Sequence, residues 1–443
     1  MTTTITSALL TLGLAFDNCT VTHDIADTIT SPQGTVVTNV PPRTIVRLNL
    51  HPSGSSNIRV EIWLPDKENW NGRFLGLGTG GMGNSLRENT AFVGALRQGY
   101  AQAYSDLGTT VSGVGNPDVW KDFGHRATHL TAVVGKAIAK SVYGRAPEFS
   151  YFTGGSTGGQ QALSLAQRYP EDYDGIVAGV PAHRRVALHA YFVWSEQILQ
   201  KCPFTESQKD AVRQAGYDVL APRGPKELAG KTVADPVLQP GDIDAVIRLA
   251  LEQDPTLTPA HAAALKKLFE GPRRADTGEK IFDGVPFGAS LWSGAGHFYP
   301  FQWVFGEGFD FRKFDFAGDY EKYHAALSPD LDAENTDLEP FRTRGGKLLM
   351  SSGAVDQIVP FHATLDYYNR VSERQGGRER TREFFRYWII PGMGHSWDWM
   401  NRGPDWLGLL RDWREKGTAP GEIKISRVDA KGVVEATVPV FPQ

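Results

Sequence analysis

Apolar and polar positions follow strand-like patterns through the N-terminal part of the chain. Residues 44–50 and 58–64 alternate between apolar and polar side chains, as half-buried β-strands do. Residues 73–78 and 101–104 are two further strand candidates, and residues 127–142 place Ala, Val and Lys at helical spacing. Strands and helices then alternate, which predicts an α/β fold with a largely parallel sheet covered on both faces.

The alternation is interrupted between residues 183 and 340. This segment contains frequent Pro and Gly, a few helical stretches and many aromatic residues. One helix has a clear beginning, with Thr258 as its N-cap and Pro259 in the first helical position. The strand pattern resumes at Lys347. We therefore expect a sheet whose two sequence halves are separated by a large insertion.

The composition is that of an ordinary globular protein and gives no sign of a nucleic-acid or membrane partner. Of the 443 residues, 41% are hydrophobic and 22% are charged, and the formal net charge is -4. No run of Lys and Arg suggests nucleic-acid binding. No apolar stretch approaches the roughly 18 residues that a membrane-spanning helix needs.

Two features bear on the cellular compartment without deciding it. The short apolar run at residues 8–14 has no preceding Lys or Arg, so we expect no signal peptide. The chain is then cytoplasmic as it stands, or secreted if a leader was removed. Cys19 and Cys202 are the only cysteines, which excludes a disulfide framework and a Cys-rich metal site, and we expect both thiols to be free.

A candidate nucleophile lies in a glycine-rich turn. Residues 149–153 form a strand-like run, and Gly154, Ser156 and Gly158 then give the pattern Gly-x-Ser-x-Gly before the helix-like residues 160–169. This strand–turn–helix context is typical of the nucleophile elbow of α/β-hydrolases. The turn strains the serine backbone and exposes its hydroxyl, while the helix N-terminus faces the developing negative charge. We predict Ser156 as the nucleophile.

A serine nucleophile needs a base and an orienting acid, which follow it along the chain in this fold. Asp356 lies in the loop after the strand-like residues 347–352, and His395 lies in a glycine-rich loop after the strand-like residues 384–390. We predict these two residues as acid and base.

Each of these two residues has a rival. His362 follows Asp356 too closely to lie on a separate loop, and Asp366 falls in a helix-like run that we expect to face solvent. The chain has 11 histidines, so any single one is more often structural than catalytic, and the glycine-flanked loop after the last strong strand favours His395. We therefore keep Asp356 and His395.

The oxyanion hole is expected to combine two backbone donors. One is the N–H of Thr157, directly after the nucleophile, and the other comes from the loop at residues 79–83 that follows the third strand. Gly80 and Gly81 are both candidates, and the sequence does not separate them. These features predict an α/β-hydrolase fold with a large inserted lid domain. The expected domains are residues 1–182 (catalytic, first part), 183–340 (lid) and 341–443 (catalytic, second part).

Several longer stretches extend the similarity beyond the serine motif. They are residues 70–75, 122–127, 143–159, 168–179 and 311–316, together with the loops of Asp356 and His395. In these stretches the chain resembles the tannase and feruloyl esterase family, which also contains an esterase of a terephthalate half-ester. The resemblance implies a serine carboxylic-ester hydrolase that cleaves small esters of aromatic (phenolic) acids through an acyl-enzyme, without a cofactor.

The chain departs from the family pattern in two places. Many members have cysteines just before the nucleophile and just after the histidine, where this chain has Gly155 and Ser396. We therefore expect no disulfide between these loops. Many members also have a calcium loop in the lid, but residues 202–244 contain only scattered acids such as Asp235 and Asp242. We expect no bound metal.

The insertion contains a group of aromatic side chains with two open interpretations. They could stack on an aromatic acyl group, or they could form a small core of the lid itself. No Arg among them suggests a carboxylate clamp, so we favour a phenolic ester over a half-ester, and an acyltransferase or a silent binding protein on this fold is a further alternative. The candidate substrate-binding rings are Trp292, Phe298, Phe301, Trp303 and Phe305.

Overall fold

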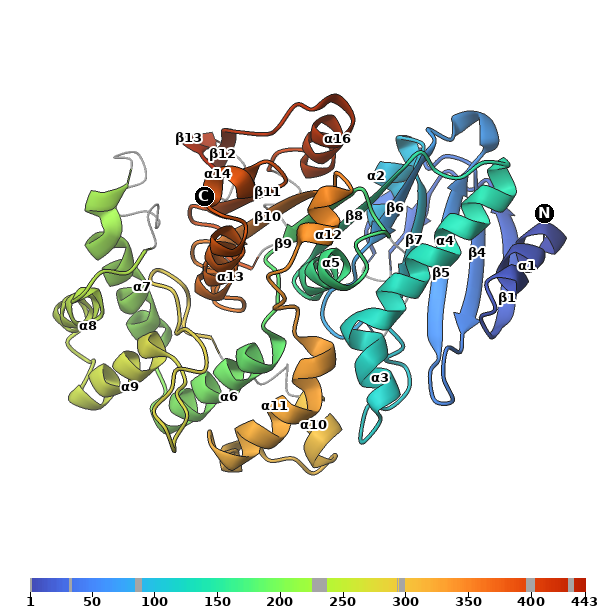
Figure 1. The fold of residues 1–443 in the computed structure, drawn as a ribbon. Coiled ribbons are helices and arrows are strands. Elements are labelled where there is room, and N and C mark those ends of the chain that lie inside the picture. The colour runs from blue at the N-terminus through green and yellow to red at the C-terminus, as the bar shows by residue number, and fades with distance from the viewer. Residues whose placement is uncertain are drawn as a thin grey trace.

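The computed structural model describes residues 2–31, 34–83, 90–224, 237–292, 294, 299–395, 403–428 and 434–443. Its centre is a nine-stranded sheet with the order β1-β4-β5-β7-β6-β8-β9-β10-β11 (Figure 1). The strands are β1 (Phe16–Asp24), β4 (Arg43–Leu50), β5 (Ile58–Pro65), β6 (Arg73–Leu77), β7 (Ala101–Ser105), β8 (Phe149–Gly155), β9 (Gly175–Gly179), β10 (Lys347–Gly353) and β11 (Phe385–Ile390). A separate pair is formed by β2 (Ile29–Thr30) and β3 (Val36–Val37).

The sheet has an antiparallel part and a parallel part. Strands β1, β4, β5 and β7 pair in antiparallel fashion, whereas β7, β6, β8, β9, β10 and β11 all run parallel to their neighbours. The carboxyl ends of β6, β8, β10 and β11 therefore meet at one edge of the sheet, which is where open α/β sheets bind ligands.

Helices cover both faces of the sheet, because successive strand residues point to opposite sides. In β8, Phe152 packs into the hydrophobic cluster that contains α4, α5 and α13, whereas Tyr151 packs into the cluster that contains α16. Helix α2 covers the antiparallel strands on the side of α16. These helices are α2 (Thr90–Arg97), α4 (Ala127–Tyr143), α5 (Thr157–Arg168), α13 (Phe361–Arg374) and α16 (Trp406–Lys416), with the short α3 (Pro117–Lys121) and α14 (Arg378–Arg382) beside them.

The insertion between β9 and β10 is helical in its regular parts. Figure 1 shows it in green to orange, below and to the left of the sheet. The expected helix start is present, since the Thr258 side chain accepts from the His261 N–H and Pro259 begins α9. No helix of the described ranges is both long enough and apolar enough to cross a membrane. The helices are α6 (Arg185–Lys201), α7 (Glu206–Leu220), α8 (Asp242–Gln253), α9 (Pro259–Glu270), α10 (Tyr299–Phe305), α11 (Gly318–Leu331) and α12 (Glu339–Thr343).

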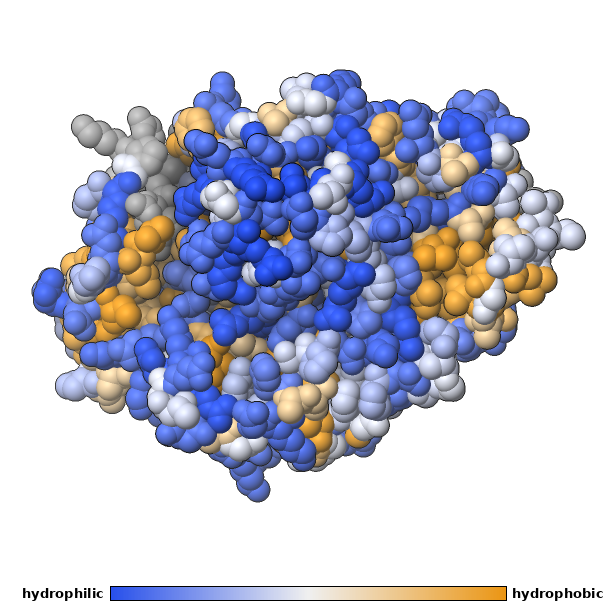
Figure 2. Space-filling view, in the orientation of Figure 1, coloured by the Kyte–Doolittle hydropathy of each residue, from blue (hydrophilic) through white to orange (hydrophobic). Residues whose placement is uncertain are grey.

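Both ends of the chain add elements that the apolar pattern did not predict. The short apolar run near the N-terminus lies partly in α1 (Thr2–Thr11), whose Ile5 and Leu9 are buried in the main hydrophobic cluster. Near the C-terminus, β12 (Ile423–Val428) and β13 (Val434–Val440) form a hairpin. The face drawn in Figure 2 is mostly hydrophilic, with an apolar area on the side of α1.

Candidate active site

The turn between β8 and α5 holds Ser156 in a backbone conformation that residues other than glycine rarely adopt. Its φ and ψ are 58° and -118°, and a conformation of this kind costs about 1–3 kcal/mol. Backbone hydrogen bonds hold it in place, since the Ser156 N–H donates to the Gly179 carbonyl (2.9 Å) and its carbonyl accepts from the Ala182 N–H (3.1 Å). The strained turn predicted from the motif is present.

The glycines around the serine are required by close approach of three segments. A Cβ on Gly154 would lie 2.5 Å from the Gly158 carbonyl oxygen, and one on Gly78 would lie 2.8 Å from the Gly158 Cα. A Cβ on Gly159 would lie 2.5 Å from the Gly179 carbonyl oxygen. The end of β8, the start of α5 and the loop after β6 therefore pack backbone against backbone at this point.

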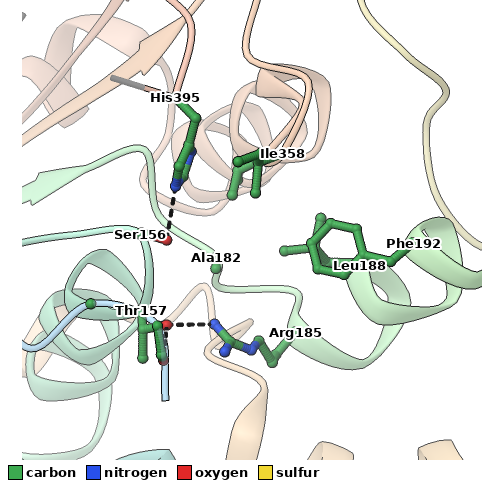
Figure 3. Close-up of a pocket in the computed structure, with 11 residues that line it drawn as sticks. Ser156, Thr157, Ala182, Arg185, Leu188, Phe192, Ile358 and His395 are labelled. Atoms are coloured by element: carbon green, nitrogen blue, oxygen red, sulfur yellow. Dashed lines mark hydrogen bonds between the residues drawn. The ribbon is translucent and has the colours of Figure 1, made fainter. Parts of the chain in front are cut away.

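Ser156, His395 and Asp356 form a continuous hydrogen-bonded chain. His395 Nε2 lies 3.0 Å from Ser156 Oγ (Figure 3), and His395 Nδ1 lies 2.8 Å from Asp356 Oδ2. The other carboxylate oxygen accepts from the N–H groups of Ile358 and Val359, each at 2.9 Å. Because an ionised carboxylate only accepts, Nδ1 is the donor and Nε2 is left to accept the serine proton.

The two rival residues lie elsewhere. His362 is near the start of α13, where burial lowers its pKa to about 4 and neither ring nitrogen has a hydrogen-bond partner in the described part of the chain. Asp366 pairs with Arg370 at 2.8 Å, and its side chain is 57% exposed. The structure brings neither residue to Ser156.

Three residues that line the serine pocket, Gly80, Gly81 and Thr157, carry backbone N–H groups that are candidate oxyanion donors. Thr157 is the first residue of α5, so its N–H has no acceptor within the helix. The N–H groups of Gly80 and Gly81 have no protein acceptor among the residues that the structure describes. The preceding residue, Thr79, is held by Gln161 through both its N–H (3.2 Å) and its carbonyl (3.1 Å). Gly80 and Gly81 both remain candidates.

The serine and the histidine open into a pocket of about 140 Å³. A cavity of about 150 Å³ accommodates benzene, so this volume suits one aromatic ring. Of the described residues that line it, Arg185 carries the only permanent charge. Apart from Arg185 and the candidate catalytic and oxyanion residues, the wall is apolar and consists of Ala182, Leu188, Phe192, Ile358 and Val359.

Of the five aromatic residues singled out in the insertion, the four that the structure describes do not line this pocket. Phe301 is fully buried and stacks on Tyr323 with ring centroids 4.2 Å apart. Trp303 packs edge-on against Phe123, and Phe305 packs against Phe309 at 5.3 Å. Their arrangement favours the interpretation that these rings form a core of the insertion.

The remaining two rings differ from these three. Trp292 packs edge-on against Phe192 at 5.2 Å, and so lies one residue behind the pocket wall. Phe298 lies outside the described residues.

Sequence reasoning missed the side of the pocket that α6 supplies. Arg185, Leu188 and Phe192 are spaced so that they share one face of this helix. The spacing was readable in the sequence, but nothing in it indicated that this face lies over Ser156.

The described residues contain no group of three or more His, Cys, Asp or Glu side chains arranged to hold a metal ion. Asp242 is bound by Arg223 at 2.6 Å, and Asp235 and Ser396 lie outside the described residues. Cys19 and Cys202 are free thiols.

The chain is similar to known proteins over most of its length. The family model described as "Tannase and feruloyl esterase" matches residues 44–308 and 304–442. A "Probable feruloyl esterase" of Arthroderma benhamiae is 30% identical over 428 residues, which cover 86% of this chain and 78% of the relative. The crystal structure of feruloyl esterase B from Aspergillus oryzae has a TM-score of 0.80 and 25% identity, over 96% of this chain and 92% of that chain.

A second solved structure shares the fold at lower identity. Tannin acyl hydrolase from Aspergillus niger has a TM-score of 0.79 and 18% identity, over 100% of this chain and 91% of that chain. With the family match over nearly the whole chain, the conclusion is direct: this protein has an α/β-hydrolase fold and belongs to the tannase and feruloyl esterase family of carboxylic ester hydrolases.

Proposed function

We propose that this esterase hydrolyses esters of aromatic, phenolic acids through an acyl-enzyme on Ser156. The observation that carries the proposal is the unbroken chain from Asp356 through His395 to Ser156, which opens into a pocket sized for one ring. Relatives named feruloyl esterase and tannin acyl hydrolase support an aromatic acid as the acyl group.

Acylation begins when Ser156 Oγ attacks the ester carbonyl carbon and His395 Nε2 takes the serine proton. The carbonyl oxygen becomes an oxyanion, which accepts from the Thr157 N–H and from Gly80 or Gly81. When this intermediate collapses, the bond to the alcohol oxygen breaks and His395 returns the proton to it. The alcohol leaves, and the acid remains esterified to Ser156.

Deacylation repeats the same steps with water. His395 takes a proton from the water as it attacks the acyl carbon, and the second oxyanion uses the same donors. Collapse breaks the bond to Ser156 Oγ, which recovers its proton from His395. The free acid leaves, and Asp356 keeps the imidazole in one orientation throughout.

We assign residues 183–340 as the lid, inserted between catalytic parts at residues 1–182 and 341–443. Its helix α6 places Leu188 and Phe192 across the pocket from the serine, where an aromatic acyl ring would lie against them (Figure 3). The ring would lose contact with water on entering this apolar wall, which stabilises binding in proportion to the apolar area buried.

A panel of esters tests the proposal. Methyl ferulate, methyl gallate, a terephthalate half-ester, and p-nitrophenyl acetate and octanoate would each be assayed with the wild type and with Ser156→Ala. We expect selective cleavage of a phenolic acid ester that Ser156→Ala abolishes. Activity retained by Ser156→Ala would contradict the mechanism, whereas cleavage of the p-nitrophenyl esters alone would contradict the aromatic-acid assignment.

A further inference from the structure

Arg185 is a buried cation beside the proposed nucleophile, and it has no carboxylate partner among the residues that the structure describes. It is the first residue of α6, it is only 4% exposed, and it lines the same pocket as Ser156 and His395. None of the described Asp and Glu side chains forms an ion pair with it. Burial of an uncompensated charge is costly, so a residue kept in this state points to a role in the site.

Two consecutive hydrogen bonds, here called the relay, connect the Arg185 guanidinium through the Thr157 side chain to the glycine loop at residues 79–83. Arg185 Nη1 donates to Thr157 Oγ1 at 2.9 Å (Figure 3), and Thr157 Oγ1 in turn donates to the Gly81 carbonyl at 2.8 Å. A guanidinium has only donors, so the threonine proton must point toward Gly81. The relay therefore joins both sources of oxyanion donors, the first residue of α5 and the glycine loop.

The glycine loop needs such a tether at this point. Gly81 has a φ of 59°, and a Cβ built on it would meet no atom of the described residues within 4 Å, so the position where a side chain would begin is open. The Thr157 hydroxyl is the side-chain group that binds its carbonyl.

Arg185 is itself fixed from two other segments. Its Nη2 donates to the Tyr299 hydroxyl of α10 at 2.9 Å. Its guanidinium carbon lies 5.2 Å from the centre of the Phe123 ring, which belongs to the π-helical turn Asp122–Arg126. A cation held in this way keeps one geometry through the reaction, which is the property that electrostatic stabilisation of a transition state requires.

We propose that Arg185 is a positioning residue of the oxyanion hole. Acting through Thr157, it aligns the backbone donors, and its unneutralised charge favours the negative tetrahedral intermediate over the neutral ester. This inference rests on the proposed serine mechanism and adds a residue to it. Because the effect grows with the charge on the oxygen, it acts on kcat more than on KM.

Kinetics of Arg185→Met on a neutral methyl ester tests this role. Loss of one direct oxyanion donor lowers kcat about 10²–10³-fold, and for a residue that acts through another we expect a loss of about 10–100-fold with KM little changed. Arg185→Lys keeps the charge and should restore part of the rate. Arg184→Met removes the neighbouring charge at the same helix start and serves as the matched control, with the wild-type rate expected.

A double-mutant cycle with Thr157→Val separates the relay from independent effects. If the two residues act as one unit, the double variant loses no more activity than the more damaged single variant. Thermal unfolding followed by circular dichroism checks that each variant is folded.

Besides an undiminished rate in Arg185→Met, three results would overturn the inference. They are an equal loss in Arg184→Met, additive losses in the cycle, and a loss confined to the KM of esters whose acyl group carries a carboxylate, which would make Arg185 a ligand of the substrate instead. Failure of the serine mechanism is distinguishable, because Ser156→Ala would then retain activity, whereas Ser156-dependent turnover that is undiminished in Arg185→Met contradicts this inference alone.

Discussion

The loops at the carboxyl edge of the sheet and the aromatic segment of the insertion are built on different principles. In the loops, polar groups are fixed one by one: Asp356 accepts from two backbone N–H groups and from His395, and Ser156 is held by backbone bonds on both sides. In the insertion, rings such as Phe301 and Tyr323 are held by their mutual packing. The hydrogen bonds in the loops fix the positions of individual polar atoms, whereas the packing in the insertion fixes a layer of aromatic rings, here called the ring layer, as a group.

We infer from this difference that the loops serve the chemical step, whereas the insertion serves the choice of substrate. The proposed reacting groups come from loops of the sheet, and the insertion reaches the pocket through one face of α6, with Arg185, Leu188 and Phe192. Changes in the loops should therefore alter the rate of the chemical step. Changes in the ring layer should alter stability, and changes on the α6 face should alter which ester is chosen.

The largest effect is expected in the loops. His395→Ala should lower kcat by about 10⁵–10⁶-fold, because the serine then has no base, and Asp356→Asn by about 10⁴-fold, because the imidazole is left in the wrong tautomer. Steady-state kinetics on p-nitrophenyl acetate measures both. His362→Ala, at the rival histidine, should keep kcat near the wild-type value, and a collapse of activity there would contradict the assigned base.

The ring layer should respond in stability and the α6 face in selectivity. Phe301→Ala removes a fully buried ring and should cost about 3–5 kcal/mol of unfolding free energy, measured by denaturant titration.

Phe192→Ala should also destabilise the protein, but it should in addition lower the ratio of kcat/KM for an aromatic ester to kcat/KM for an acetyl ester. If Phe192→Ala left this selectivity ratio unchanged, or if Phe301→Ala lowered it, the assignment of selectivity to the α6 face and of stability to the ring layer would be contradicted.

The glycines of the turn give a smaller effect on stability. In Gly154→Ala the new Cβ would lie 2.5 Å from the Gly158 carbonyl oxygen, so we expect a loss of about 1–3 kcal/mol together with reduced activity. Gly94→Ala, where a Cβ meets no atom within 4 Å, is the control and should be neutral or slightly stabilising. Thermal unfolding compares the two, and equal behaviour would show that the close approach is not needed.

The smallest effect on stability is expected at Glu334, where the insertion contacts α13, and only at acidic pH. Glu334 lies in the segment between α11 and α12, near His183 (2.5 Å) and Arg370 (2.6 Å). Burial opposes its charged form, but the neighbouring His183, Arg370 and Arg184 outweigh burial and lower the pKa of Glu334 to about 2.

Because the folded-state pKa of Glu334 lies below its ordinary value of 4.5, its contribution is present above pH 4.5 and is lost as the pH falls toward about 2. Glu334→Gln should therefore flatten this part of the curve of unfolding free energy against pH. Asp366→Asn, on the exposed side of Arg370, should leave it unchanged. If Glu334→Gln lost unfolding free energy at acidic pH as the wild type does, other groups would be responsible for that loss.

The sequence was most informative where local structure and chemistry coincide. Strand β8, the strained Ser156 and helix α5 occur as the glycine pattern predicted, because a turn of this kind is specified by neighbouring residues. Asp356 and His395 could be assigned because parallel strands bring their carboxyl ends together. The edge strand β1 was not predicted, because its irregular pairing with β4 follows no clean apolar alternation.

The pocket wall could not be predicted, because it depends on how distant segments pack. The periodicity of α6 shows that Leu188 and Phe192 share a face, but not which surface that face covers. Nor does it show that Tyr299, far along the chain, meets Arg185. For the same reason, the aromatic run that contains Phe301 and Trp303 was compatible with either a binding wall or a core, and only the packing distinguishes the two.

Detection of the acyl-enzyme on Ser156 would test the proposed mechanism at its defining step. The protein would be mixed with methyl ferulate or p-nitrophenyl acetate, quenched in acid within the first turnovers, and examined by intact and peptide mass spectrometry. The proposed acyl-enzyme mechanism predicts one added acyl group, located on the peptide that contains Ser156 and missing in Ser156→Ala. Turnover of the ester with no adduct on that peptide, or an adduct that persists in Ser156→Ala, would contradict it.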